Sequence, residues 1–552
     1  MTEATVSATP DTPQRVLWAV AYAALLYYAQ TLLRSSPPSV VEVTALVALA
    51  LAALGIATAL LASADRAAPW HMTALSVTTL VVALTVRGLH PFSDETLFFA
   101  ASGRLLRHGV DPYGVNLVQS WPLLHHLPDQ YFTNLLDGTH VTQLAYPAGA
   151  LGPLWAIGWF SPLWAPVILA ILAWVAAGLA AYWLLPRPWR AVAGLLVTFT
   201  PLLLTYTAGV GDAMLVAPLV VALGTMRHVT ATTPNWRRWI SPVALGLAVS
   251  VKPTPAVFLP FILVSLVFEV PGLRAALRRA ATYLAAVAGA FLVVNAPFIL
   301  WGFTAWRRAI LIPLTAHLQP SGVGVVSLFT SGVATGVHLN YLSLAGLLVL
   351  AGTGIALFAW YDHLRIAWPM LVSLFFLVEP RSYWSYVAYP FVAGLVYALT
   401  LPARPATSNR PTPDARFAPL VRPARLLAVA ALVAGALTTV GAFLPATIDV
   451  TSVHWTTSSG NVDQVTATLS NHLATPQTVV VRPFSPTSGI SNAAWMVDIA
   501  TGSNRVVLAP HSELTVTLRS STPEVPTATP WFLEAATTSQ IVRSPIYGAP
   551  PR

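Results

Sequence analysis

Residues 39–63 read SVVEVTALVALALAALGIATALLAS, an apolar run interrupted by one acid, Glu42. A helix needs about 20 residues to cross the roughly 30 Å of hydrocarbon in a bilayer. Because hydrocarbon offers the backbone no hydrogen-bond partners, a crossing segment of this kind has to be helical. The stretch therefore predicts a transmembrane helix and sets the class of protein for the chain around it.

Runs of similar character recur along most of the chain. The segments predicted to cross the membrane are 16–33, 39–63, 71–88, 148–185, 191–206, 213–226, 241–270, 281–300, 340–360, 366–378, 388–401 and 426–446. The run 241–270 contains Lys252-Pro-Thr-Pro255, and prolines this close together favour two half-helices over one continuous span. We count this run as a hairpin and 148–185 as one crossing with a broken entry near Phe160-Ser-Pro162, which predicts thirteen crossings.

The composition supports the same class. Of 552 residues, 56% are hydrophobic and only 9% are charged, whereas soluble domains average about 25% charged residues. The net charge of +9 comes mainly from arginines in short loops between apolar runs. Membrane topology explains such arginines, so no nucleic-acid partner is expected. The chain has no cysteine, which excludes disulfides and thiolate metal sites.

The arginines also predict the orientation. With the N-terminus in the cytoplasm, the inner loops contain Arg187, Arg190, Arg227, Arg237, Arg238, Arg274, Arg278, Arg279, Arg404, Arg410, Arg416, Arg422 and Arg425. This arrangement satisfies the positive-inside rule and places the loops 89–147 and 301–339 outside. Residues 1–15 are predicted to be a disordered cytoplasmic tail and residues 16–446 a transmembrane domain. Abundant arginine, alanine and proline suggest a bacterial source, and hence a multi-pass protein of the bacterial plasma membrane.

The chain changes character near residue 447. Segments such as Thr478-Val-Val-Val-Arg482 and Glu513-Leu-Thr-Val-Thr-Leu-Arg519 alternate polar and apolar residues or run in β-branched ones, separated by turn residues. About seven short strands over roughly 105 residues favour a β-sandwich. We therefore predict a multi-pass α-helical membrane protein with an extracytoplasmic β-sandwich over residues 447–552, whose role is to bind a glycan or to cap the membrane domain.

Two adjacent acids, Asp94 and Glu95, follow the third apolar run in the outer loop 89–147. Ionisable residues at the mouth of a membrane span indicate function by default. The residues that follow predict a short amphipathic helix ending near Gly109. This helix would lie on the membrane surface and hold an acid over a cavity.

An acid at the outer leaflet together with scattered cations suits the transfer of a sugar from a lipid phosphate to a hydroxyl. The carboxylate would take the acceptor proton, and the cations would hold the departing phosphate. The candidate phosphate-binding residues are Lys252, Arg307, Arg308, His317 and Arg381. Asp212 lies in a glycine-rich break of another outer loop and is a candidate for approaching the sugar.

Several motifs occur in a suggestive order: Asp94-Glu95, the turn Gly109 to Tyr113, Tyr146-Pro147, Lys252-Pro253 and Pro380-Arg-Ser-Tyr-Trp384. Over about residues 70–400 this order resembles the GT-C class of polyprenyl-phosphate-sugar glycosyltransferases. Within that class the chain looks most like the bacterial polyprenyl-phosphate-mannose mannosyltransferases. It departs from their pattern by two extra spans before the acidic loop and by the C-terminal β domain. The second departure is similar to arabinofuranosyltransferases of the same class.

The resemblance implies a polyprenyl-phosphate sugar donor, a glycolipid or cell-envelope glycan acceptor and an extracytoplasmic site. It carries the role of catalytic base over to Asp94 and that of a histidine near the lipid phosphate to His317. Further residues of the matching motifs that we expect at the substrate are Glu95, Asp111, Tyr113 and Tyr383. No cofactor and no metal ion are expected.

Each of these residues also has a purely structural interpretation. Asp94 is a good helix N-cap, and Glu95 is a favourable acid in a first turn. Asp111 before proline suits a turn, and Asp212 suits a helix cap. Lys252 could extend to the membrane interface. Arg307 and Arg308 could anchor an interfacial helix beside Trp301 and Trp306.

The sequence leaves several alternatives open. The donor sugar is mannose or arabinose, and the acceptor, the linkage and the oligomeric state are not determined. A transporter or flippase of a lipid-linked glycan would use a similar cavity without bond chemistry, but transporters commonly have internal repeats and none is evident here. A non-catalytic membrane scaffold whose β domain binds cell-wall polymer is the third alternative. For a scaffold, Asp94 would be dispensable.

Overall fold

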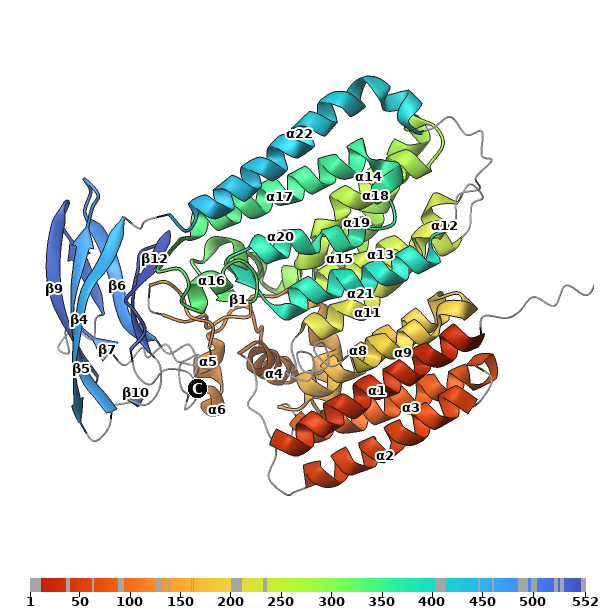
Figure 1. The fold of residues 1–552 in the computed structure, drawn as a ribbon, viewed down its shortest axis with the longest axis horizontal. Helices are drawn as coiled ribbons and strands as arrows, with labels where there is room; N and C mark the ends of the chain where they lie inside the picture. The colour runs from red at the N-terminus through yellow and green to blue at the C-terminus, as the bar shows by residue number, and fades with distance from the viewer. Residues whose placement is uncertain are drawn as a thin grey trace, which may run out of the picture.

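The chain folds into a bundle of helices with β-sheets at one end (Figure 1). The computed structural model describes residues 11–35, 40–61, 64–87, 94–125, 132–137, 139–159, 161, 163–199, 211–231, 236–402, 413–444, 447–458, 461–484, 495–497, 504–520, 525–526 and 531–547. Predictions for the tail before Asp11, for the second half of the 191–206 span and for the inner-loop residues Arg404 and Arg410 lie outside these residues.

Seven helical segments of the described chain are long and apolar enough to cross a membrane. They are Glu42–Leu61, Arg66–Leu84, Ala165–Leu184, Asp212–Thr230, Leu273–Thr315, Leu339–Ala359 and Pro419–Gly441. Shorter apolar stretches follow at Ala148–Ile157, Thr254–Glu269 and Trp368–Val378. These helices agree with the prediction of an α-helical membrane protein.

The first half of the chain contributes helices on both sides of the acid pair. The helices that precede it are α1 (Asp11–Ser35), α2 (Val40–Leu61) and α3 (Ala64–Arg87). The segment after α3 contains α4 (Asp94–Arg107), α5 (Leu117–Ser120) and α6 (Pro122–His125). Most residues of α4 are buried in the protein, whereas a helix on the membrane surface was predicted. The bundle continues through α7 (Leu151–Ile157), α8 (Ala165–Leu184), α9 (Ala191–Thr198), α11 (Asp212–Gly224) and α12 (Met226–Thr230).

The second half of the bundle runs from α13 to α22. Its helices are α13 (Ile240–Val251), α14 (Leu259–Glu269), α15 (Leu273–Thr315), α16 (Ser327–Thr330), α17 (Leu339–Ala359), α18 (Tyr361–Leu364), α19 (Trp368–Leu371), α20 (Ser373–Val378), α21 (Trp384–Thr400) and α22 (Pro413–Gly441). Close packing of α17 on α22 depends on small residues, because a side chain at Gly352 would meet Leu432 at 2.9 Å.

Several boundaries differ from prediction. Helix α1 begins at Asp11, within the predicted 1–15 tail. Helix α15 continues to Thr315, where a loop was expected from residue 301, and it kinks at Gly302, whose φ of −163° and ψ of 74° are not helical. Helix α22 starts at Pro413, well before the predicted span 426–446. Packing against neighbouring helices stabilises helical structure beyond what local propensity indicates.

Two breaks do follow the sequence. Helix α13 ends at Val251, and Lys252 has extended backbone with φ −151° and ψ 141°, since a following proline disfavours the helical conformation. A 3-10 turn, η5 (Thr254–Phe258), then leads into α14. The 148–185 run is divided in the same way into a 3-10 turn, η2 (Ala148–Ala150), and the helices α7 and α8.

The C-terminal region contains two five-stranded sheets. One has the order β10-β5-β9-β7 with β4 beside β5, from β4 (Ile448–Ser458), β5 (Asn461–Asn471), β7 (Trp495–Met496), β9 (Ser512–Ser520) and β10 (Val525–Pro526). The other has the order β2-β12-β11-β6-β8, from β2 (Gly336–His338), β6 (Gln477–Phe484), β8 (Arg505–Leu508), β11 (Phe532–Ala536) and β12 (Gln540–Arg543). Buried side chains of both sheets, such as Val465 and Leu533, form one core.

The sheets and the helical bundle share structure. Strand β2 comes from the segment between α16 and α17, yet it pairs antiparallel with β12, Val337 opposite Ile541. A buried ion pair between Arg482 and Glu534, 3.1 Å apart, also receives a hydrogen bond from Gln319 of the bundle. The sheet region therefore includes a strand from outside residues 447–552.

Candidate functional site

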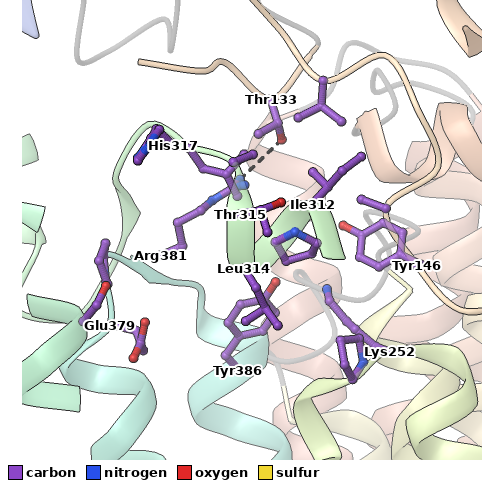
Figure 2. Close-up of a pocket in the computed structure, with 18 of the residues that line it drawn as sticks. Thr133, Tyr146, Lys252, Ile312, Leu314, Thr315, His317, Glu379, Arg381 and Tyr386 are labelled. Atoms are coloured by element: carbon purple, nitrogen blue, oxygen red, sulfur yellow. Dashed lines mark hydrogen bonds between the residues drawn. The ribbon is translucent and has the colours of Figure 1, made fainter. Parts of the chain in front are cut away.

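A cavity of about 480 Å³ lies at the end of the bundle that faces the sheets. Its walls contain Asp94, Glu95, Phe98, Thr133, Tyr146, Lys252, residues 312–318, Asn340, Ser343, Phe375, Phe376, Glu379, Arg381, Tyr386 and Thr538. Figure 2 shows Arg381 reaching toward Thr133, with Lys252 and Tyr146 on the opposite wall. Charged, aromatic and aliphatic groups thus line one cavity.

Asp94 is the first residue of α4 and is held by Thr133. Its Oδ2 atom accepts hydrogen bonds from the Thr133 amide, at 2.9 Å, and from the Thr133 hydroxyl. Its Oδ1 atom accepts from the amide of Glu95 at 2.8 Å. Since each carboxylate oxygen has two lone pairs, Oδ1 keeps one for a ligand hydroxyl.

Arg381 approaches Thr133 from the other side. Its guanidinium donates to the Thr133 hydroxyl at 3.3 Å and to the Tyr383 hydroxyl. Within the described part of the chain, its Nε atom is buried without a hydrogen-bond partner, and the guanidinium forms no salt bridge. A buried guanidinium that lines a cavity and has no direct salt bridge to a described carboxylate is suited to binding an anion.

Lys252 lies in a different electrostatic setting. Its Nζ atom is 2.9 Å from Asp212 Oδ1 and 3.5 Å from Glu95 Oε2, and it faces the rings of Tyr146 and Tyr386 at 5.1 and 4.6 Å. Ser385 donates a hydrogen bond of 2.7 Å to the second oxygen of Asp212. The side chain is 4% exposed, so it does not extend to the membrane interface. Its charge is already matched by two carboxylates.

Glu95 is the more deeply buried member of the acid pair. Burial raises the pKa of its carboxyl above the usual range, the Lys252 charge lowers it in part, and Asp212 raises it again. Its Oε1 atom has no hydrogen-bond partner among the residues that the structure places. A side chain at Gly211 would collide with this oxygen, so the glycine permits the close approach of α11 to α4.

Backbone pairing brings three distant segments around the cavity. The Leu136 amide donates to the His317 carbonyl at 2.8 Å. Further along the same loop, β1 (Ser321–Gly322) pairs parallel with β3 (Arg381–Ser382). Gly322 has a φ of +127° and lies directly on the Ser382 backbone, where no other residue would fit. Thr133, His317 and Arg381 are held on one rim by these bonds.

The structure separates the predicted site residues into groups. Asp94, Glu95, Lys252, His317 and Arg381 line the cavity. Asp212 and Tyr383 lie behind it, in contact with Lys252 and Arg381 respectively.

Four predicted residues lie elsewhere. Asp111 accepts a hydrogen bond from the Tyr113 amide at 3.0 Å, as expected of a turn, and Tyr113 donates to the Tyr146 carbonyl at 2.9 Å. Arg307 and Arg308 are exposed on α15. Their positions agree with the structural interpretation and not with a place in the cavity.

Sequence reasoning missed several residues of the cavity wall. Thr133, Tyr386 and Glu379 had no motif that named them as site residues, although Glu379 precedes the quoted Pro380-Arg381 stretch. Burial raises the pKa of the Glu379 carboxyl from 4.5 to about 7. Thr538 comes from the turn between β11 and β12, so only the tertiary structure could reveal that the sheet region reaches the cavity.

Among the described residues, no group of three or more His, Cys, Asp or Glu side chains is placed to hold a metal ion. Comparisons with protein families, with curated proteins and with solved structures found no match.

Proposed function

We propose that the cavity transfers a sugar from a polyprenyl-phosphate carrier to a hydroxyl of a glycolipid or cell-envelope glycan. The observation that carries this proposal is the position of Thr133, whose hydroxyl contacts both the Asp94 carboxylate and the Arg381 guanidinium. A proton acceptor and an anion-binding cation therefore flank one point of the cavity wall. Transfer from a phosphate leaving group to a hydroxyl requires these two groups.

In the proposed reaction the acceptor oxygen forms a bond to the anomeric carbon of the donor while the bond from that carbon to the phosphate oxygen breaks. Asp94 takes the acceptor proton through the free lone pair of Oδ1. Arg381, with His317 on the same rim, stabilises the negative charge that develops on the lipid phosphate. The apolar wall formed by residues 312–314 and Phe375 suits the first isoprene units of the carrier.

Lys252 has a supporting role in this scheme. Because Asp212 and Glu95 already match its charge, we assign phosphate binding to Arg381 and the positioning of the acids to Lys252. Mannose is the proposed sugar and arabinofuranose the alternative.

We also propose that the chain crosses the bilayer thirteen times, with the cavity and a C-terminal β-sandwich on the extracytoplasmic side. Contacts at the far end of the bundle support this topology. There, Arg279 donates to the Val229 carbonyl, and Arg365 lies 3.3 Å from Glu269. The segments predicted to be cytoplasmic thus meet one another, while the acid-bearing segments meet at the cavity.

The test uses purified protein in nanodiscs with synthetic polyprenyl-phosphate mannose or arabinose and crude membrane acceptor. The Asp94→Asn variant should lose about 100- to 10,000-fold of the transfer rate, the usual contribution of a general base. Asp111→Asn removes a carboxyl from the turn that follows α4. This carboxyl lies outside the cavity, so the variant should retain activity.

Undiminished transfer by Asp94→Asn would place the base elsewhere. Absence of transfer from either donor by the folded wild-type protein would favour a transporter, which flipping of a fluorescent lipid-linked glycan in proteoliposomes would then detect.

A further inference from the structure

A second cavity, of about 300 Å³, lies at the opposite end of α13 from Lys252. Its lining residues are Val229, Arg238, Trp239, Pro242, Ala275, Arg278, Arg279, Thr282 and Tyr283. They come from α12, from the 3-10 turn η4 (Trp236–Trp239), and from the first turns of α13 and α15. We call this cavity the arginine pocket.

The floor of the arginine pocket is rigidly built. Tyr283 is 2% exposed and shares a hydrogen bond of 3.1 Å with the Ser241 hydroxyl. Arg279 donates to the Val229 carbonyl, which fixes α15 against the end of α12. These contacts connect α12, α13 and α15, three of the four elements that form the pocket.

The charge of the pocket is unbalanced. Three arginines line it and no acid does, and within the described chain Arg238 and Arg278 form no salt bridge. The neighbouring residues 232–235 read TTPN and contain no acid. Glu269, the acid closest in sequence to α15, is engaged by Arg365 at 3.3 Å and by the Tyr361 hydroxyl at 2.9 Å. A pocket with several guanidinium groups and no carboxylate is suited to a phosphate group.

The surroundings point to a lipid as the source of this phosphate. Trp236, Trp239, Leu273 and Leu277 are 71%, 42%, 48% and 54% exposed. Tryptophans concentrate at the level of lipid headgroups, and basic pockets between membrane helices bind anionic headgroups. Free phosphate would need the arginines but not these apolar side chains.

We propose that the arginine pocket binds the phosphate of an anionic phospholipid from the membrane leaflet on its side. Arg238 and Arg278 contact the phosphate oxygens, and Arg279 shapes the pocket while adding positive charge. The acyl chains lie along the exposed apolar residues of η4 and α15. This site is independent of the sugar-transfer proposal, because it shares no residue with the cavity that Asp94 lines.

The test is a titration by native mass spectrometry of the full-length protein in detergent, with phosphatidylglycerol, phosphatidylcholine or inorganic phosphate. The Arg238→Gln/Arg278→Gln variant should bind phosphatidylglycerol at least tenfold more weakly than the wild type. The matched control Arg227→Gln/Arg274→Gln removes two arginines of the same end of the bundle that do not line the pocket. Its affinity should change by less than twofold.

Three results would overturn the proposal. Equal losses in the two variants would mean that the lipid responds only to the general positive charge. Phosphatidylcholine binding as tightly as phosphatidylglycerol would exclude recognition of a net negative headgroup. Inorganic phosphate binding as tightly as phosphatidylglycerol would make the site one for a free anion. Since Arg278 is exposed, the single Arg278→Gln variant, which should lose at least threefold, gives an independent reading if the double variant does not fold.

Discussion

The two ends of α13 differ in how their charges are matched. At the cavity lined by Asp94, Lys252 has two carboxylate partners within 3.5 Å, so these charges hold one another in place. At the arginine pocket, three cations face a space that no acid lines. A buried charge with carboxylate partners in the protein supports the structure, whereas cations around a cavity without acids are available to a ligand. Arg381 lines the same cavity as Asp94, Glu95 and Glu379, but it forms no salt bridge within the described chain and so remains available to a ligand.

The largest expected effect concerns Lys252 and its two carboxylate partners at the C-terminal end of α13. Lys252→Met leaves Asp212 and Glu95 buried without their cation, and breaking a buried pair on one side costs about 3–5 kcal/mol. We expect a marked fall in thermal unfolding temperature, measured by tryptophan fluorescence of the purified protein. The double variant Lys252→Met/Asp212→Asn should recover part of the loss, and a single variant as stable as wild type would show that the pairing is not structural.

The next effect tests Arg381 as an anion site. Arg381→Gln removes a donor from the departing phosphate, and loss of such a donor lowers a rate by about 100- to 1,000-fold. The rate of sugar transfer should fall by this amount, while tryptophan fluorescence shows a change in unfolding temperature smaller than that of Lys252→Met. A stability loss as large as that of Lys252→Met, or an unchanged rate, would contradict the distinction between the two cations.

A smaller effect concerns Glu379, the acid on the Arg381 side of the cavity. Burial raises the pKa of its carboxyl from the ordinary value of 4.5 to about 7 in the folded protein. Between these pH values the unfolded chain releases the proton and the folded one keeps it, so stability falls as pH rises from about 4.5 to 7 and is level above that range. The loss is at most about 3 kcal/mol.

Unfolding temperatures measured across this pH range check the prediction. The Glu379→Gln variant has no side chain at this position that can titrate, so the stability of the variant should not fall in this way. The stability of the variant relative to the wild type should therefore increase as the pH rises to about 7. A difference that is constant over the range would indicate that Glu379 has an ordinary pKa.

The smallest effect is expected at Arg308, which is exposed on α15. Arg308→Ala should change stability by no more than about 0.5 kcal/mol, as is usual for surface substitutions, and should leave transfer within twofold. The rates of sugar transfer of Arg308→Ala and Arg381→Gln should be measured under the same conditions and compared. A large loss of transfer would show that Arg308 contributes to the site, although it does not line the cavity.

Local sequence predicted the individual breaks and turns well. The extended Lys252 before Pro253 and the hydrogen bond from the Tyr113 amide to Asp111 both follow from the chemistry of neighbouring residues. The helical segment between the non-helical Gly302 and Thr315 does not, because a loop was predicted from residue 301 onward. Neighbouring residues predict the backbone correctly where contacts between distant segments do not override their preferences.

The membrane class and the presence of an acid pair at the end of an apolar run were determined by the sequence alone, because hydrocarbon excludes charge and imposes length on every crossing segment. Only the tertiary structure decided which cations are paired. Asp212, Lys252 and Glu95 come from three segments far apart in the chain, as do Asp94, Thr133 and Arg381. Electrostatic pairing depends on distances of a few ångströms between side chains, and the folding of distant segments against one another sets those distances.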